Sequence, residues 1–235
     1  MGWWSYLTSG ASYGGDDGIT HRLVQHLTYT GLALLFSSAL AMPLGLLLGH
    51  ARRGGSAVIA LAGLGRAVPT FGVLVLFAVS RYGATTTTLT VTLVLFAIPP
   101  VLTNTYAGVA GVDDEVIEAA RGMGLSGRQV LTGTELPLAL PLIAAGIRIA
   151  TVQIIATATI ASYVGLGGLG AIIFRGYNNS EDAYKIAGAL LVVVLALTAQ
   201  QLLGLVQRAV TPVPLRVPGG TSRRMARAAA ASSPA

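Results

Sequence analysis

Long apolar stretches separated by short polar connections dominate the pattern of the chain. A helix needs about 20 mostly apolar residues to cross a bilayer. Five stretches reach that length: residues 27–49, 57–79, 89–110, 138–164 and 186–206. Arg66 and Pro69 interrupt the second of them. The pattern therefore predicts an all-α integral membrane protein with about five transmembrane helices in one permease-sized domain, residues 27–207.

The composition supports a membrane protein. Of 235 residues, 53% are hydrophobic and only 10% are charged, whereas a typical soluble domain is about 25% charged. The absence of cysteine excludes a disulfide framework and a thiolate metal site. The net charge of +6 does not indicate nucleic-acid binding, because the arginines lie at the ends of apolar stretches and near the C-terminus.

The distribution of basic residues predicts the orientation. With five spans the two termini lie on opposite sides of the membrane. One side receives nine arginines: Arg52, Arg53, Arg121, Arg128, Arg208, Arg216, Arg223, Arg224 and Arg227. The other side receives four basic residues: Arg22, Arg81, Arg175 and Lys185. Because cytoplasmic loops carry the excess of Lys and Arg, we expect residues 1–26 outside and residues 208–235 in the cytoplasm, the latter as a disordered tail.

The connection over residues 111–137 is too long and too patterned for an ordinary loop. Asp113 and Asp114 suit a helix N-terminus, and Gly122, Gly124 and Gly127 suit its end. The pattern predicts two short amphipathic helices with a glycine joint on the cytoplasmic surface, and Pro137 at the start of the fourth span. Small side chains at Ala119 and Ala120 would let another protein approach closely, although a plain interfacial loop is the alternative.

The same connection carries a spaced motif. Its members are Glu118, Ala119, Ala120, Gly124, Leu136 and Pro137. They resemble the EAA signature of type I ABC-importer permeases, which is E-A-A, three residues, G, nine residues, then I-x-L-P. Thr134 stands where the family usually has an apolar residue. The resemblance implies a coupling helix that docks in a groove of a cytoplasmic ATP-hydrolysing subunit.

From about Ile98 to Tyr177 the chain resembles the permeases of osmoprotectant importers. This implies a multi-pass permease of the bacterial inner membrane that carries glycine betaine, choline, carnitine or proline betaine by alternating access. The implied partners are cytoplasmic ABC ATPases, a second permease subunit and a separate extracytoplasmic binding protein. We expect no cofactor in this chain, with ATP and Mg bound by the ATPase, because a P-loop needs a Gly-Lys pair and the only lysine is Lys185.

Polar and aromatic residues within the spans are the candidates for the translocation pathway, because intramembrane polar groups are costly and usually functional. We select Asn104, Tyr106, Gln153, Thr157 and Tyr163. Aromatic faces suit quaternary ammonium groups, which adds Phe71 beside the two tyrosines. For Arg148 we favour a structural pairing, with a carbonyl or with Glu135, and the role of Arg66 stays open.

A glycine-rich turn ends the fourth span. It contains Gly165, Gly167, Gly168 and Gly170. Although the spacing fits G-x-G-x-x-G, a dinucleotide site would also require a preceding strand and a later acidic residue, and the apolar context gives neither. We expect a gate or bend at the outer end of the span, where small residues allow close packing.

Two other functions stay open. One is a permease of the same architecture for another solute, such as methionine, phosphonate or an anion. The other is a secondary transporter or channel without an ATPase. Ion-coupled transport usually needs acidic residues inside the membrane, and the five apolar stretches contain neither Asp nor Glu.

Overall fold

The computed structural model describes residues 2–211, apart from the side chains of Leu64, Arg66 and Ala67. The described part is helical throughout. Its elements are α1 (Trp3–Thr8), η1 (Gly10–Tyr13), α2 (Ile19–His50), α3 (Gly55–Ala67), α4 (Thr70–Val79), α5 (Thr86–Ala110), α6 (Asp114–Gly122), α7 (Gly127–Val130), η2 (Leu131–Glu135), α8 (Leu136–Ala158), η3 (Thr159–Val164), α9 (Gly170–Asn178) and α10 (Asp182–Val210). The roles considered for the Arg66 side chain and for residues 212–235 fall outside the described part.

Four helices in the described part are long and apolar enough to cross a membrane. They are α2, α5, the continuous helix Gly127–Val164 and α10. The stretch over residues 57–79 is not one continuous helix as expected, because it is divided into α3 and α4 at Val68 and Pro69. Proline has no backbone N–H and disfavours a helical residue before it. Pro69 instead takes an extended conformation as the N-cap of α4.

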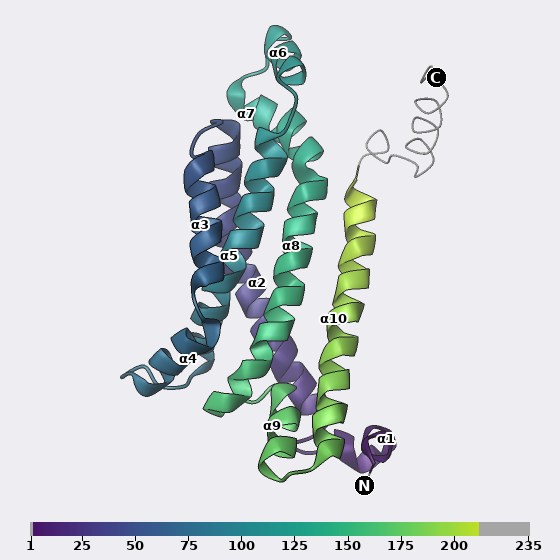
Figure 1. Ribbon diagram of the computed structural model, residues 1–235. Helices are drawn as coiled ribbons and strands as arrows, with labels where there is room; N and C mark the ends of the chain where they lie inside the picture. Colours follow the sequence, from purple (N-terminus) through teal and green to yellow (C-terminus); the bar gives the residue numbers. More distant parts are fainter. Residues whose placement is uncertain (1, 212–235) are drawn as a thin grey trace, which may run out of the picture.

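The long helices run side by side along the bundle, with α2, α5 and α10 directed toward the end that carries α6 and α8 directed the opposite way (Figure 1). At one end of the bundle, α6 and α7 lie beyond the ends of α2, α5 and α8. We call this the α6 end, and α10 also finishes on this side. At the opposite end, called the α9 end, α9 lies beside the start of α10 and the N-terminal α1, while α4 turns away from the bundle.

The packing of α2 along α5 depends on small side chains. Five buried residues recur at every fourth position of α2: Ala33, Ser37, Ala41, Gly45 and Gly49. A Cβ on Gly45 would lie 2.7 Å from Cβ of Thr105, and one on Gly49 equally close to Cβ of Val109. Small residues let membrane helices approach closely. This stripe therefore holds α2 directly against α5 over the half of the bundle nearer the α6 end.

Close approach also joins α5 to α8. A Cβ on Gly146 would lie 2.7 Å from Cβ of Asn104, and one on Gly108 would lie 3.1 Å from Cβ of Ala139. The main core, which includes Leu93, Val101 and Ile154, lies among α2, α5 and α8. These three helices form the central layer on which the remaining elements pack.

Candidate functional site

α6 has well-formed ends. The side chain of Asp113 accepts a hydrogen bond from the backbone N–H of Glu115 (3.1 Å), as the sequence predicts for an N-cap. At the other end Gly124 has φ +84°. Its N–H donates to the Arg121 carbonyl (2.9 Å) and that of Leu125 to the Ala120 carbonyl (3.3 Å). This pair of bonds is a Schellman motif, which commonly requires glycine at the left-handed position.

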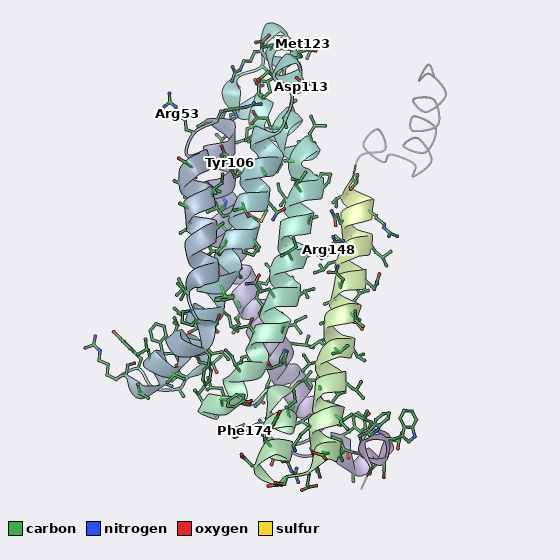
Figure 2. The ribbon with its side chains drawn as sticks, viewed as in Figure 1. Arg53, Tyr106, Asp113, Met123, Arg148 and Phe174 are labelled. Atoms are coloured by element: carbon green, nitrogen blue, oxygen red, sulfur yellow. The ribbon has the colours of Figure 1, made fainter. Side chains whose placement is uncertain are left out.

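α6 has one face toward its own chain and one toward the surroundings. Ile117 and Ala120 are buried in a small cluster with Val112 and Val130. The exposed face includes Glu118 and Ala119, together with Val116 and Met123, the latter 75% exposed. The expectation that Ala119 and Ala120 both face another protein is therefore wrong for Ala120, which packs on α7. Figure 2 shows Met123 at the tip of the bundle.

The second piece of the connection is not a separate helix. α7, η2 and α8 form one helix from Gly127 to Val164, so Pro137 lies inside it and not at its start. Pro137 has no N–H for a bond to the carbonyl of Gly133, four residues earlier. The helix widens here into π geometry, with the Leu136 N–H donating to the Leu131 carbonyl. π-turns often occur at functional sites.

A buried acid pairs with a histidine at the base of this segment. Glu135 is 1% exposed, and its Oε2 lies 2.6 Å from Nδ1 of His50 at the end of α2. A Cβ on Gly127 would lie 3.4 Å from Nε2 of His50, so the imidazole fits between α7 and η2. The sequence pattern does not reveal this pair, because it places Glu135 in a short amphipathic helix on the membrane surface and not in the buried part of a long helix.

Glu135 is therefore not the partner of Arg148, as had been considered. Arg148 extends from α8 toward α10 (Figure 2), and its Nη1 would lie 3.5 Å from a Cβ on Gly204. Its Nε is buried and makes no hydrogen bond within the described part of the chain. The guanidinium group of Arg148 thus occupies the space that Gly204 leaves on α10.

Arg52 forms a second contact between α2 and the connection. Its Nη1 lies 3.0 Å from Oδ1 of Asp114, and its Nη2 donates to the Val112 carbonyl. Arg52 has φ +52°, in the left-handed region that favours glycine. Arg52 and His50 thus hold the connection just before α6 and just after α7.

Two pathway candidates make hydrogen bonds to carbonyls of α5, the helix that contains Pro99 and Pro100. Gln153 Nε2 lies 3.4 Å from the carbonyl of Phe96 on α5. Because Pro100 lacks an N–H, that carbonyl has no partner at the usual position four residues on. Asn104 Nδ2 donates to the Pro100 carbonyl (2.8 Å). Thr157 lies farther along α8 and is partly buried.

The structure separates the aromatic candidates. Tyr163 contacts Phe71 edge-on, with centroids 5.7 Å apart, and also Phe174 at 5.0 Å. Phe174 lies at the α9 end, whereas Tyr106 lies near the α6 end (Figure 2). The hydroxyl of Tyr106 faces the start of α3 at Gly55. The selected tyrosines therefore do not form a single aromatic cage within one subunit.

The glycine-rich turn reverses the chain at the α9 end. Gly165, Gly167 and Gly168 all have positive φ. Gly170 begins α9 where any Cβ would overlap the Thr159 carbonyl. We call residues 165–170 the outer loop.

Side chains of α2 hold the outer loop. Gln25 Oε1 accepts from the Gly168 N–H (3.0 Å), and Nδ1 of His26 accepts from the Leu169 N–H (3.3 Å). The hydroxyl of Tyr29 donates to the Leu166 carbonyl. The apolar pattern does not predict these contacts, although the polar run "THRLVQHLTY" at and just before the start of the first apolar stretch could have indicated a polar contact.

Comparison with known proteins identifies the family. A family described as "Binding-protein-dependent transport system inner membrane component" matches residues 41–212. The chain belongs to this family. It is thus a permease, the membrane component of an ABC importer and not its ATPase, and the expected multi-pass membrane location is confirmed.

Relatives of this permease include several osmoprotectant permeases. The chain is 34% identical over 194 residues to the glycine betaine/carnitine/choline permease OpuCB of Bacillus subtilis, covering 83% of this chain and 89% of that protein. It is 37% identical to the carnitine permease OpuCD of Listeria monocytogenes, covering 88% and 91%. It is 32% identical to the osmoprotectant import permease OsmW of Salmonella typhimurium, covering 90% and 98%.

The fold of this permease resembles that of a solved transporter. An inward-facing structure of the MetNI methionine ABC transporter matches with a TM-score of 0.69 at 24% identity, covering 80% of this chain and 94% of that one. A second crystal form gives a TM-score of 0.71 at the same identity. The likeness concerns the fold alone. The predicted all-helical permease architecture is therefore confirmed, with α3 and α4 as the departure described above.

Proposed function

We propose that this permease imports osmoprotectants of the glycine betaine, choline and carnitine class as one subunit of an ATP-driven transporter. The observation that carries the proposal is the similarity along most of the chain to permeases named for those solutes. A methionine permease is the rival. The likeness to a methionine transporter supports only a shared fold, because identity there is 24%.

α6 is the coupling helix in this proposal. It lies beyond the ends of the long helices (Figure 1), with Glu118, Ala119 and Met123 exposed. Ile117 and Ala120 anchor it to its own chain. A short helix with an exposed apolar residue at its tip suits a groove in a partner. The partner is the cytoplasmic ATPase, which binds ATP and Mg.

The α6 end then faces the cytoplasm. The described arginines of that end are Arg52, Arg53, Arg121, Arg128 and Arg208, whereas the α9 end has Arg22, Arg81, Arg175 and Lys185. Within the described part the difference is five arginines against four basic residues, and the other four arginines counted for this side in the sequence fall outside the described residues. The positive-inside rule supports this orientation, with α1 and α9 on the extracytoplasmic side where the binding protein docks.

Transport proceeds by alternating access between two permease subunits. ATP closes the paired ATPases, which move the two coupling helices, and the long helices then open toward the docked binding protein. Because coupling between two binding sites is reciprocal, docking of the loaded binding protein favours the ATP-closed state. The second permease subunit is an identical copy or a paralogue.

The pathway passes the α5 and α8 surfaces that carry Asn104, Gln153 and Thr157. Tyr106 lies toward its cytoplasmic mouth and Tyr163 toward its outer mouth. The aromatic contact of Tyr163 with Phe71 and Phe174 supports an outer surface suited to quaternary ammonium groups. The outer loop is the gate beside it.

The test is purification of the tagged chain from its native membrane, followed by identification of co-purifying proteins. ATPase activity is then measured with and without glycine betaine, choline and methionine. We expect an ABC ATPase and a binding protein, with ATP hydrolysis that rises on a betaine or choline.

Stimulation by methionine alone would contradict the substrate class but leave the coupling role intact. A chain that purifies alone and transports in liposomes without ATP would contradict the coupling role as well. The two parts of the proposal are therefore tested separately in one preparation.

A further inference from the structure

We propose that α2 links the coupling segment, residues 111–137, to the outer loop. His50 and Arg52 are the positioning residues at and just after one end of α2, and Gln25, His26 and Tyr29 are those near the other. The proposal rests on the coupling role of α6 given above. It assigns the transmission of movement to specific side chains that contact neither ATP nor substrate.

At the cytoplasmic end, the last residue of α2 and the turn that follows it hold the coupling segment on both sides. Arg52 contacts Val112 and Asp114 just before and at the start of α6. His50 contacts Glu135 just after α7. A displacement of α6 and α7 by the ATPase therefore pulls on α2 through two separate polar contacts.

The backbone at Arg52 supports a dedicated role. The Arg52 N–H donates to the Gly49 carbonyl (3.0 Å) and that of Arg53 to the Leu48 carbonyl (3.2 Å), the bonds of a Schellman motif. Glycine is usual at this position, and Arg52 occupies it with φ +52°. A residue held in a disfavoured conformation is a reason to look for function, and here its side chain reaches the coupling segment.

At the outer end, three side chains of α2 hold the loop by its backbone. His26 is fully buried, and its Nε2 lies 3.0 Å from the Ile155 carbonyl of α8 while its Nδ1 accepts from Leu169. Both ring nitrogens are thus used, as a neutral imidazole allows. Gln25 and Tyr29 hold Gly168 and Leu166.

α2 is better suited to this transmission than α8, which also joins the two regions. α8 continues into the π-turn η2 at one end and the 3-10 segment η3 at the other, and such segments often mark hinges. α2 stays one helix of 32 residues despite Pro43, and packs on α5 by its stripe of small residues. About 36 Å of helix separates His26 from His50.

The first test uses the reconstituted permease with its ATPase and binding protein in liposomes. The quantity is solute transported per ATP hydrolysed. Arg52→Gly removes the side chain and suits the backbone, while Tyr29→Phe removes only the hydroxyl that bonds to Leu166. Arg53→Gly is the matched control, because Arg53 is exposed and points away from the bundle (Figure 2).

We expect each of the two variants to lower the ratio about three-fold or more, within the range that mutations along coupling networks produce. The double variant should be no worse than the poorer single variant, because both interrupt one connection. Independent sites this far apart would have additive effects. A wild-type ratio in Arg52→Gly, or fully additive losses in the double variant, would overturn the proposal.

A second readout reports the outer loop directly. The chain has no cysteine, so Val164→Cys beside the loop is a unique site for maleimide labelling. We expect ATP to change its labelling rate, and Arg52→Gly to abolish that change while the ATPase still co-purifies. A change that persists in Arg52→Gly, or none in the otherwise unaltered chain, overturns the proposal. Failure of the ATPase to co-purify would count instead against the coupling role of α6.

Discussion

Glu135, almost completely buried within the helix Gly127–Val164, lies 2.6 Å from Nδ1 of His50 at the end of α2. The two residues are 85 positions apart. A carboxylate only accepts hydrogen bonds, so the imidazole is the donor. A buried acid without such a donor would be strongly unfavourable, so this contact allows Glu135 to be buried where η2 packs against the end of α2.

Replacing His50 alone should destabilise the permease more than replacing both partners. His50→Leu leaves Glu135 buried and unpaired, at a cost of about 3 kcal/mol. His50→Leu combined with Glu135→Leu removes the buried charge and should recover much of that loss. Thermal unfolding in detergent of the single and double variants measures this. Equal melting temperatures of the single and the double variant would show that an unpaired Glu135 costs little.

Two substitutions at Gly124 should separate the effect of backbone strain from the effect of a lost contact with the ATPase. Any side chain at φ +84° costs about 1 kcal/mol, yet the surrounding space within the chain is open. Gly124→Ala therefore reports the strain alone. Gly124→Trp should in addition disturb docking, and uncouple ATP hydrolysis from uptake while the spans stay folded. ATPase activity stimulated by the binding protein is measured together with uptake. A wild-type ratio of solute transported to ATP hydrolysed in Gly124→Trp would count against α6 as the coupling helix.

Gly165 and Gly167 form a matched pair in the outer loop. Both have φ near +80°, but a Cβ on Gly165 meets nothing, whereas one on Gly167 would overlap Arg22 and Gln25. Alanine costs about 1 kcal/mol at either position from the backbone. Only Gly167→Ala should also displace the loop from α2 and lower uptake well below that of Gly165→Ala. Similar uptake by the two variants would show that the α2 contact is dispensable.

The packing of α2 on α5 can be tested on one helix. Gly45→Leu places a side chain where a Cβ already lies 2.7 Å from Thr105, whereas Gly31 has open space around it. Both changes raise helix propensity equally, so any difference arises from packing. We expect Gly45→Leu to lower the melting temperature, by an amount equivalent to about 2 kcal/mol of overpacking, and Gly31→Leu to leave it unchanged or raise it.

The sequence was sufficient where the controlling interactions are local. The apolar stretches predict α2, α5, α8 and α10, and most ends of these helices lie within a few residues of the predicted ones. The reason is that the bilayer dictates the length and composition of a span. Start and stop signals at Asp113 and Gly124 act within one turn, and the structure has both caps. Pro69 also has a local effect, but its strength, a complete break and not a kink, was underestimated.

The tertiary structure decided which polar groups meet. Apolar helices can pack in many registers, so a sequence pattern does not tell that Glu135 finds His50, that Gln153 faces the carbonyl left by Pro100, or that Gln25, His26 and Tyr29 hold the outer loop. Each of these contacts joins residues at least 57 positions apart. In an apolar environment a buried polar group without a partner is costly, and only the packed bundle determines which partner is within reach.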